Sequence, residues 1–120
     1  MKKPEVQLIT FLKSQLRDKQ AKSFSVKMRG QVYDGLVIFW EGKYFAYQNL
    51  CKHVPVTLDL RDGKFFNHEK TKLQCHMHGA IYEVETGECT AGPCVGAKLN
   101  ALAIEEQATR IIVRVVAEVV

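Results

Sequence analysis

The chain has 120 residues, which is the usual size of one domain and enough to bury a hydrophobic core. Its hydrophobic content of 47% and charged content of 25% argue against a disordered chain, and a net charge of +4 is too small to indicate nucleic acid binding. No convincing signal peptide follows Lys2 and Lys3, and no apolar run approaches the roughly 20 residues of a transmembrane helix. We therefore expect a single domain over residues 1–120, located in the reducing cytoplasm and bound to neither membrane nor nucleic acid.

Residues 4–16 permit two interpretations. Leucine recurs at every fourth position from Leu8 to Leu16, as on one face of a helix. Val6, Leu8 and Thr10 alternate with their neighbours as they would in a strand. The stretch is predicted to be either a packed helix at the edge of the fold or a short strand.

An alternating strand is predicted shortly after residue 20. Phe24, Val26 and Met28 alternate with polar residues, which is the period of a half-buried strand. Residues 29–35 contain two glycines and an aspartate, so we expect a turn there.

A β-hairpin is predicted next. The apolar run 36–40 is rich in β-favouring residues and too short for a helix. Glu41-Gly42 separates this run from a second strand over 43–47. We expect Trp40 and the nearby tyrosines to pack in the core rather than to form a ligand-stacking surface.

The rest of the chain also indicates short strands separated by turns. Strands are predicted at 64–66, 80–84, 99–104 and 110–116, with turns at 85–87 and 91–96. In the final strand Ile111, Val113 and Val115 would face one way, and Arg110 and Arg114 the other. The predicted fold class is all-β, as a sandwich or barrel without internal repeats.

Two segments combine cysteine with histidine and contain the candidate metal ligands. They are Cys51-Lys52-His53 and Cys75-His76-Met77-His78, with 21 residues between them. Thiolates stabilise ferric iron, and uncharged imidazoles leave an iron easier to reduce. A [2Fe–2S] centre with two cysteines on one iron and two histidines on the other uses this ligand set, and its oxidised form carries no net charge.

The residues around these segments carry a family resemblance. The second segment continues as C-H-M-H-G-A and is followed by Thr86-Gly87 and Gly92-Pro93-Cys94. With the C-x-H of the first segment, these motifs resemble the Rieske-type ferredoxins over nearly the whole chain. The resemblance implies a Rieske-like β-sandwich with an inserted cluster-binding lobe at about 49–94. It also favours a strand at 6–9 and a tight turn near 16–19.

The resemblance further implies one [2Fe–2S] cluster per chain. Cys51 and Cys75 would hold the buried iron, and His53 and His78 would hold the outer iron. The electron would enter and leave through the histidine edge. Mixed ligation implies a potential in the family's range of about −150 to +300 mV.

Structural zinc is the alternative, because two cysteines and two histidines also suit that metal. Zinc fingers pair like ligands as C-x₂₋₄-C and H-x₃₋₅-H, whereas each segment here mixes the two types, so we prefer the cluster. Cysteine–histidine hydrolysis is poorly supported, because two equivalent loops do not form a nucleophile with its base.

Residues near the ligands bear on the potential. High-potential Rieske proteins carry an extra cysteine in each loop, joined as a disulfide, and a serine that bonds a cluster sulfide. Val56, Met77 and Ala80 occupy those places here, which implies a lower potential. Tyr82 matches a tyrosine that bonds a ligand cysteine in that group, so an intermediate potential is implied. A contact with sulfur and a purely packing role are both open for Tyr82.

Cys89 and Cys94 lie outside the ligand spacing. In the family Gly92-Pro93 belongs to a loop that folds over the cluster, and we expect Cys94 to fill space there as a small hydrophobe. A Cys89–Cys94 disulfide is conceivable but not expected in a reducing compartment. We expect His68 and His76 to be solvated rather than to act as further ligands.

The function implied by the resemblance is electron transfer rather than catalysis. Family members of this build are ferredoxin components of ring-hydroxylating dioxygenases or small subunits of NAD(P)H-dependent nitrite reductases. We expect a carrier between a reductase and a terminal oxygenase or reductase, since no flavin or nicotinamide fingerprint and no two-histidine, one-carboxylate iron site is found. A zinc-stabilised interaction module is the alternative from another class.

The lysines near the ligand segments suggest a docking surface. Lys52, Lys64, Lys70 and Lys72 fall on or between the two segments. They form either an ordinary solvated face or a basic rim that attracts an acidic redox partner.

Overall fold

The described part of the chain is built from β-strands. The computed structural model describes residues 5–52, 56–59, 63–77 and 79–117. Its elements are β1 (Glu5–Leu12), η1 (Lys13–Gln15, a 3₁₀ helix), β2 (Gln20–Met28), β3 (Gln31–Trp40), β4 (Lys43–Gln48), β5 (Leu73–Gln74), β6 (Ile81–Tyr82), β7 (Cys89–Ala91), β8 (Ala103–Glu106) and β9 (Arg110–Ala117). The prediction of an all-β fold is confirmed. No helix among the described residues is long and apolar enough to cross a membrane.

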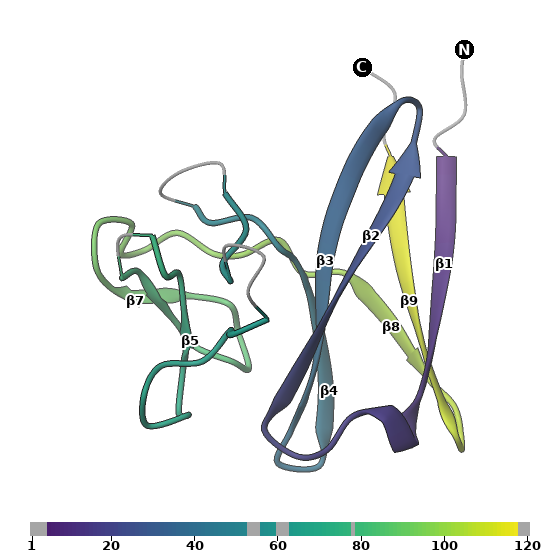
Figure 1. The fold of residues 1–120 in the computed structure, drawn as a ribbon, viewed down its shortest axis with the longest axis horizontal. Coiled ribbons are helices and arrows are strands. Elements are labelled where there is room, and N and C mark those ends of the chain that lie inside the picture. Colours follow the sequence, from purple (N-terminus) through teal and green to yellow (C-terminus); the bar gives the residue numbers. More distant parts are fainter. Residues whose placement is uncertain (1–4, 53–55, 60–62, 78, 118–120) are drawn as a thin grey trace.

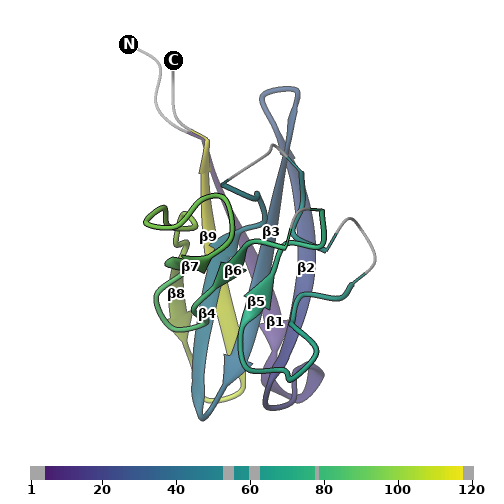
Figure 2. The same ribbon diagram turned by 90° about the vertical axis from the view of Figure 1, so that its left-hand side faces the viewer.

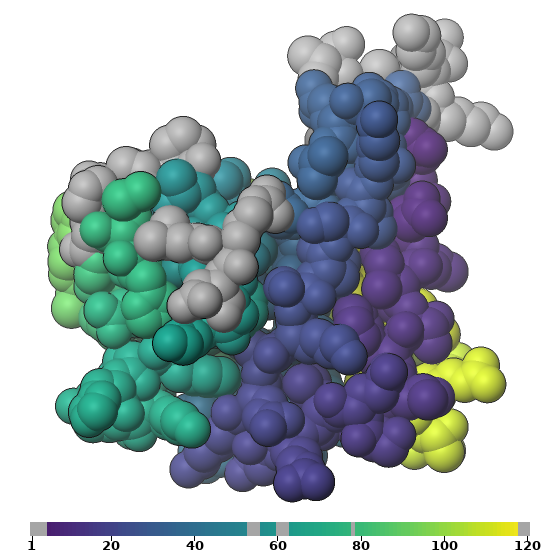
Figure 3. Space-filling model, viewed as in Figure 1, coloured from purple at the N-terminus to yellow at the C-terminus, as the bar shows by residue number. Residues whose placement is uncertain are grey.

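Three antiparallel sheets are arranged as a sandwich with a lobe beside it. Their strand orders are β1-β9-β8, β2-β3-β4 and β5-β6-β7. The first two sheets form the sandwich. The third sheet lies beside them, on the left in Figure 1, and this side of the molecule faces the viewer in Figure 2. We call the described residues within 49–94 the lobe. In the space-filling view the lobe packs against the β2-β3-β4 sheet, and the tip of the β2–β3 hairpin projects past it (Figure 3).

Strand β3 is buried on both faces and joins two cores. Val37 packs between the two sheets of the sandwich, whereas Leu36, Ile38 and Trp40 pack against the lobe. The core between the sheets contains Phe11, Leu16, Val37, Ala46, Ile111 and Val113. The core against the lobe contains Leu36, Ile38, Trp40, Tyr47, Cys51, Leu58, Phe65, Leu73, Cys75, Ala80, Tyr82, Val84, Cys89 and Leu99. Burial on both faces explains why 36–40 is an unbroken apolar run rather than an alternating one.

The N-terminal stretch is a strand, and the alternative helix is wrong. Strand β1 pairs with β9 from Glu5 opposite Ala117 to Leu12 opposite Arg110. The leucines do not share a buried face: Leu8 is 61% exposed and Leu12 is 47% exposed, whereas Leu16 is buried after the 3₁₀ turn. The ladder with β9 outweighs the helical spacing because it satisfies the backbone groups of the whole segment.

The turn predicted for 29–35 is much shorter. Only Arg29 and Gly30 turn, both with positive φ, and β3 begins at the next residue. Gly35 lies inside β3 because the Phe24 ring covers it; an added Cβ would lie 2.3 Å from Phe24 Cζ. Glycine here marks a close side-chain approach within a strand rather than a turn.

The β3–β4 hairpin is confirmed. Its two turn residues, Glu41 and Gly42, have φ values of 48° and 83°, as a two-residue turn of type I′ requires. Trp40 is buried and stacks on Phe66 of the lobe, with ring centroids 5.7 Å apart. The core role expected for Trp40 is therefore confirmed.

Strand boundaries in the second half differ from the predictions. Of 64–66 only Phe66 makes a β-bridge, to Leu73, and the strand predicted at 80–84 is limited to β6. Strand β8 starts four residues later than expected, at Ala103. In β9 the predicted faces are confirmed, with Ile111, Val113 and Val115 buried and the two arginines exposed.

Candidate metal-cluster site

The two predicted cysteine ligands lie in the described part of the lobe, and the two predicted histidine ligands do not. Cys51 is 4% exposed and Cys75 is fully buried. His53 and His78 lie outside the described residues. Among the residues that are described, no group of three or more cysteine, histidine or acidic side chains could hold a metal ion.

The first ligand loop, which contains Cys51, is held by a buried polar pair. Asn49 accepts the backbone N–H of Leu58 at 2.8 Å and donates through its side-chain nitrogen to Asp59 at 3.4 Å. Asn49 and Asp59 are each 3% exposed. The N–H of Cys51 donates to the carbonyl of Val56 at 2.8 Å. Since buried polar groups are stable only when bonded, these contacts hold the chain on both sides of Cys51.

The second ligand loop, which contains Cys75, is closed by its own backbone hydrogen bonds and is hydrogen-bonded to the first. Cys75 donates its N–H to the carbonyl of Ala80 at 2.8 Å, and Gly79 returns an N–H to the carbonyl of Cys75 at 2.9 Å. The N–H of His76 donates to the carbonyl of Leu58 in the first loop at 3.0 Å. The two thiols therefore sit at the entries of two loops that are hydrogen-bonded to one another.

Tyr82 links the second loop to the sulfur of the first. It is fully buried in β6, and its hydroxyl oxygen lies 3.5 Å from Cys51 Sγ. That oxygen accepts the N–H of Lys52 at 2.9 Å. Burial, and then the contacts with the sulfurs of Cys51 and Cys94, raise the pKa of Tyr82, so the phenol keeps its proton. Of the two roles left open for Tyr82, the structure favours the sulfur contact.

The Gly92-Pro93 loop packs against the second ligand loop. An added Cβ at Gly92 would lie 2.9 Å from the Cα of Ala80, and the φ of Gly92 is 94°. A side chain at position 92 would therefore push the two loops apart. Glycine is needed here both for space and for backbone conformation.

Cys89 and Cys94 form a close pair, although the sequence analysis did not expect them to be joined. Cys94 donates to Cys89 with the sulfurs 3.1 Å apart, and neither residue is in a disulfide. Cys94 Sγ also lies 3.2 Å from the Tyr82 hydroxyl. Burial, and then the hydrogen bond from Cys94, raise the pKa of Cys89 to about 11. Space filling by Cys94 is thus only part of its role, and the only signal in the sequence was the short separation of the two cysteines.

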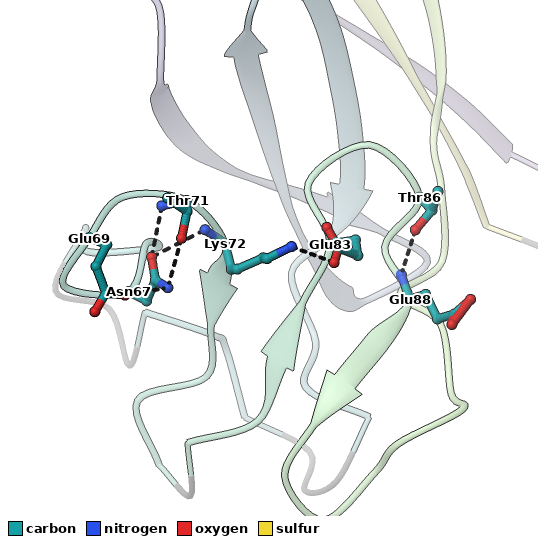
Figure 4. A network of polar contacts seen from close by, with 7 residues as sticks. All are labelled: Asn67, Glu69, Thr71, Lys72, Glu83, Thr86 and Glu88. Atoms are coloured by element: carbon teal, nitrogen blue, oxygen red, sulfur yellow. Dashed lines mark hydrogen bonds and ion pairs between the residues drawn. The ribbon is translucent and has the colours of Figure 1, made fainter.

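The surface of the lobe carries several lysines, and their contacts bear on the predicted basic rim. Lys72 forms an ion pair with Glu83, and the Asn67 side chain accepts the N–H groups of Thr71 and Lys72 (Figure 4). Lys52 donates to the side chain of Asn100 at 3.1 Å. Lys64 and Lys70 are exposed, as are His68 and His76, whose solvated positions are confirmed.

Family comparison identifies the kind of centre. The Rieske [2Fe-2S] domain model matches residues 8–112. The chain belongs to this family. As a Rieske domain it carries one [2Fe–2S] cluster, which answers the choice between a cluster and structural zinc. No curated protein matches the sequence.

Solved structures agree with the family. The ferredoxin of carbazole 1,9a-dioxygenase from Nocardioides aromaticivorans IC177 is 27% identical, with a TM-score of 0.67 over 87% of this chain and 92% of that chain. A chain in the reduced complex between oxygenase and ferredoxin in carbazole 1,9a-dioxygenase is 18% identical, with a TM-score of 0.70 over 90% of this chain and 27% of that chain. The terminal oxygenase of carbazole 1,9a-dioxygenase from Novosphingobium sp. KA1 is 20% identical, with a TM-score of 0.65 over 90% and 29%. The last two likenesses concern the fold.

The described surroundings of the two thiols fit a cluster. Cys51 and Cys75 are enclosed by the apolar core of the lobe, which excludes water from sulfur ligands. The Tyr82 hydroxyl beside Cys51 is a donor of the kind that stabilises an iron-bound thiolate.

Proposed function

We propose that Cys51 and Cys75 bind one iron of the cluster, that His53 and His78 bind the other, and that the chain is a one-electron carrier. The observation that carries this proposal is the burial of both thiols on two loops that are hydrogen-bonded to one another, in a member of the Rieske family. When bound, the cluster accepts and releases a single electron.

The residues around the thiols would set how readily that electron is accepted. An O–H donor stabilises a ligand sulfur more when the sulfur bears more negative charge, so Tyr82 favours the reduced state. Ala80 provides no hydroxyl at the position where high-potential relatives carry serine. The presence of the tyrosine donor and the absence of the serine donor support a reduction potential between those of the high-potential Rieske proteins and the Rieske-type ferredoxins.

The partners we propose are a reductase and a terminal oxygenase or reductase, with the chain itself not an enzyme. Support comes from the similar protein named as the ferredoxin of a dioxygenase, which this chain matches over most of both lengths. The small subunit of an NAD(P)H-dependent nitrite reductase is the alternative system within the same family. Both alternatives use the chain to pass electrons between proteins.

A basic groove beside the second loop supports an acidic docking face on the partner. Lys19, Lys64 and Lys70 line it together with His68 and His76, and its volume is about 800 Å³. Lys72 contributes less charge than the sequence suggested, because Glu83 pairs with it. Exposed charges act mainly on the association rate and are screened beyond about 10 Å at 0.1 M salt, so electron delivery should slow as salt rises.

We further propose that residues 1–120 form one Rieske domain, with its cluster-binding lobe at about 49–94, and that it works in the cytoplasm.

The test is an anaerobic reductive titration of the purified protein, followed by visible absorption and by assay of iron and inorganic sulfide. We expect a coloured protein that takes up one electron per chain and returns it on reoxidation. A colourless protein without inorganic sulfide would contradict the proposal. A coloured protein that delivers electrons to a nitrite reductase but to no oxygenase would select the alternative system.

A further inference from the structure

Cys89 and Cys94 are placed to react with one another. Their sulfurs are 3.1 Å apart, against about 2.0 Å in a disulfide, so bonding requires an approach of about 1 Å. Cys89 lies in β7, and its backbone is held by hydrogen bonds with Ala97 and Gly96. The N–H of Ala97 also donates to the carbonyl of Cys94 at 3.0 Å. Both cysteines are therefore held at the base of one short loop, facing each other.

The two thiols differ in access. Cys89 is 1% exposed, and its S–H donates to the carbonyl of Ala91 at 3.3 Å. Cys94 is partly exposed, next to Gly92-Pro93. A reagent in solution would therefore meet Cys94 first, and Cys89 could react only with a group already attached to Cys94.

A line of polar contacts connects the pair to a proposed cluster ligand. Cys94 Sγ is 3.2 Å from the Tyr82 hydroxyl, and that hydroxyl is 3.5 Å from Cys51 Sγ. Tyr82 has a single hydroxyl hydrogen and two sulfurs within reach. Its oxygen already accepts the N–H of Lys52, so the hydrogen is available to the sulfurs.

We propose that Cys89 and Cys94 form a reversible dithiol–disulfide site, oxidised by small disulfides such as oxidised glutathione, and that its state changes the hydrogen bond from Tyr82 to Cys51. The first half of this proposal stands without the proposed function, and the second half rests on Cys51 being a cluster ligand. The site is separate from the loop disulfide of high-potential Rieske proteins, whose places here are taken by Val56 and Met77.

The reaction proceeds in two exchanges. The Cys94 thiolate attacks one sulfur of oxidised glutathione, a bond forms between Cys94 and that sulfur, and one glutathione thiolate leaves. Cys89 then loses its proton and attacks Cys94 Sγ, which expels the second glutathione thiolate. Two protein thiols are oxidised to one disulfide, and one glutathione disulfide is reduced to two glutathione molecules, which take up the two protons. A cross-link across so short a loop adds less to the stability of the folded protein than one across a long loop, and an excess of glutathione reverses the reaction.

Oxidation of the pair should strengthen the contact between Tyr82 and Cys51. In the thiol state Cys94 donates its hydrogen to Cys89. The Cys94 sulfur then competes with the Cys51 sulfur as acceptor of the Tyr82 hydroxyl hydrogen. A disulfide sulfur carries no hydrogen and is a poorer acceptor, so the Tyr82 hydrogen turns to Cys51. The cluster potential should then rise when the disulfide forms.

The first experiment equilibrates the cluster-loaded protein anaerobically in glutathione buffers of graded ratio, alkylates the remaining thiols and maps the peptides by mass spectrometry. We expect the wild type to lose two alkylatable thiols per chain as the buffer becomes oxidising, to contain a Cys89–Cys94 disulfide, and to regain both thiols on return to a reducing buffer. The visible absorption of the cluster, recorded in the same samples, shows that Cys51 and Cys75 were not the residues oxidised.

Two variants make the order of reaction testable. Cys89→Ser should stop at a glutathione adduct on Cys94, whereas Cys94→Ser should form no adduct, because Cys89 is buried. Absence of the wild-type disulfide at every glutathione ratio would overturn the proposal. So would an equal adduct on both variants, because it would remove the difference in access on which the mechanism depends.

The second experiment measures the cluster potential in the dithiol and disulfide states. We expect a higher potential in the disulfide state, and we expect Tyr82→Phe to abolish the difference while leaving disulfide formation intact. Equal potentials in the two wild-type states would overturn the link through Tyr82. A protein without a cluster would refute the proposed function, yet its Cys89–Cys94 disulfide would still be detected by mass spectrometry, so the two failures are distinguishable.

Discussion

The sandwich and the lobe are held together in different ways. In the sandwich, β1, β2, β3 and β9 are eight to ten residues long and pair along their full lengths. In the lobe the strands are two or three residues long. Besides the core that it shares with β3, the lobe depends on single polar contacts, such as the buried Asn49–Asp59 pair and the Tyr82 hydroxyl beside the sulfurs.

This difference indicates that the sandwich mainly provides stability, whereas the lobe mainly provides the functional site. A long ladder loses little when one contact is removed, whereas a lobe built from individual contacts can lose its site through one substitution. Strand β3 joins the two regions, since its successive side chains enter different cores. Substitutions that affect one region and spare the other therefore test the comparison directly.

The largest expected effect comes from the thiols of the lobe. Cys51→Ser and Cys75→Ser should each abolish or severely weaken cluster binding, because an alkoxide is a poor ligand for sulfur-bridged iron, while the strand signal in circular dichroism stays. Cys89→Ala is the matched control and should keep most of the cluster. Equal losses of iron and inorganic sulfide in all three variants would contradict the ligand assignment.

Adjacent residues of β3 allow a sharper comparison. Leu36 and Val37 are both fully buried, one against the lobe and the other between the sheets. Leu36→Ala should destabilise the packing by about 2–5 kcal/mol, mainly in the core against the lobe. Release of the cluster to an iron chelator should therefore accelerate. Val37→Ala removes fewer atoms and should lower the thermal midpoint with a smaller effect on release. If the two variants showed the same relation between the rate of cluster release and the thermal midpoint, the sandwich and the lobe would unfold as one unit.

Tyr47 connects the sandwich to the lobe and should show a pH signature. Its hydroxyl donates to the carbonyl of Val84 at 2.6 Å, and burial, followed by the charge of Glu85, raises its pKa from 10.0 to about 12. Since the folded state holds the proton more tightly than the unfolded state, this contribution is complete below pH 10 and is lost as pH rises from 10 through 12.

Tyr47→Phe tests this signature by denaturant unfolding at a series of pH values. Near neutral pH the variant should be less stable by about 1 kcal/mol, the usual contribution of one hydrogen bond. Above pH 10 the gap between the two proteins should narrow, because only the wild type has this phenol to ionise. A gap that stayed constant to strongly alkaline pH would show that the hydroxyl is not protected as described.

The smallest expected effect concerns the potential. Tyr82→Phe removes the donor beside Cys51 and should lower the cluster potential by several tens of millivolts, where 59 mV is a tenfold change for one electron. The fold should survive because the ring remains. Tyr47→Phe is the control, since its hydroxyl bonds a carbonyl rather than a sulfur, and voltammetry should find its potential unchanged. A potential unchanged in both variants would make Tyr82 a packing residue.

Local patterns in the sequence determined much of the sandwich and the identity of the centre. The alternation of Phe24, Val26 and Met28, and that of the final strand, predicted buried faces correctly because period-two patterning is a property of a strand with one covered face. Gly42 predicted the hairpin because glycine readily takes the positive φ that the turn needs, and Glu41 adopts a positive φ beside it. The paired cysteine–histidine segments indicated the family because ligand chemistry is carried by residue type and spacing.

Only the tertiary structure decided the features that depend on residues far apart in the chain. Gly35 suggested a turn, yet the Phe24 ring makes it a strand residue. The two-sided burial of β3 requires a lobe that is built from later segments. The contact between Cys94 and Tyr82, and its extension to Cys51, arises because β6, the Gly92-Pro93 loop and the first ligand loop meet in one core. Sequence patterns record which face of a segment is apolar, but which side chains then touch is settled by packing, because neighbours in space are chosen by the whole fold.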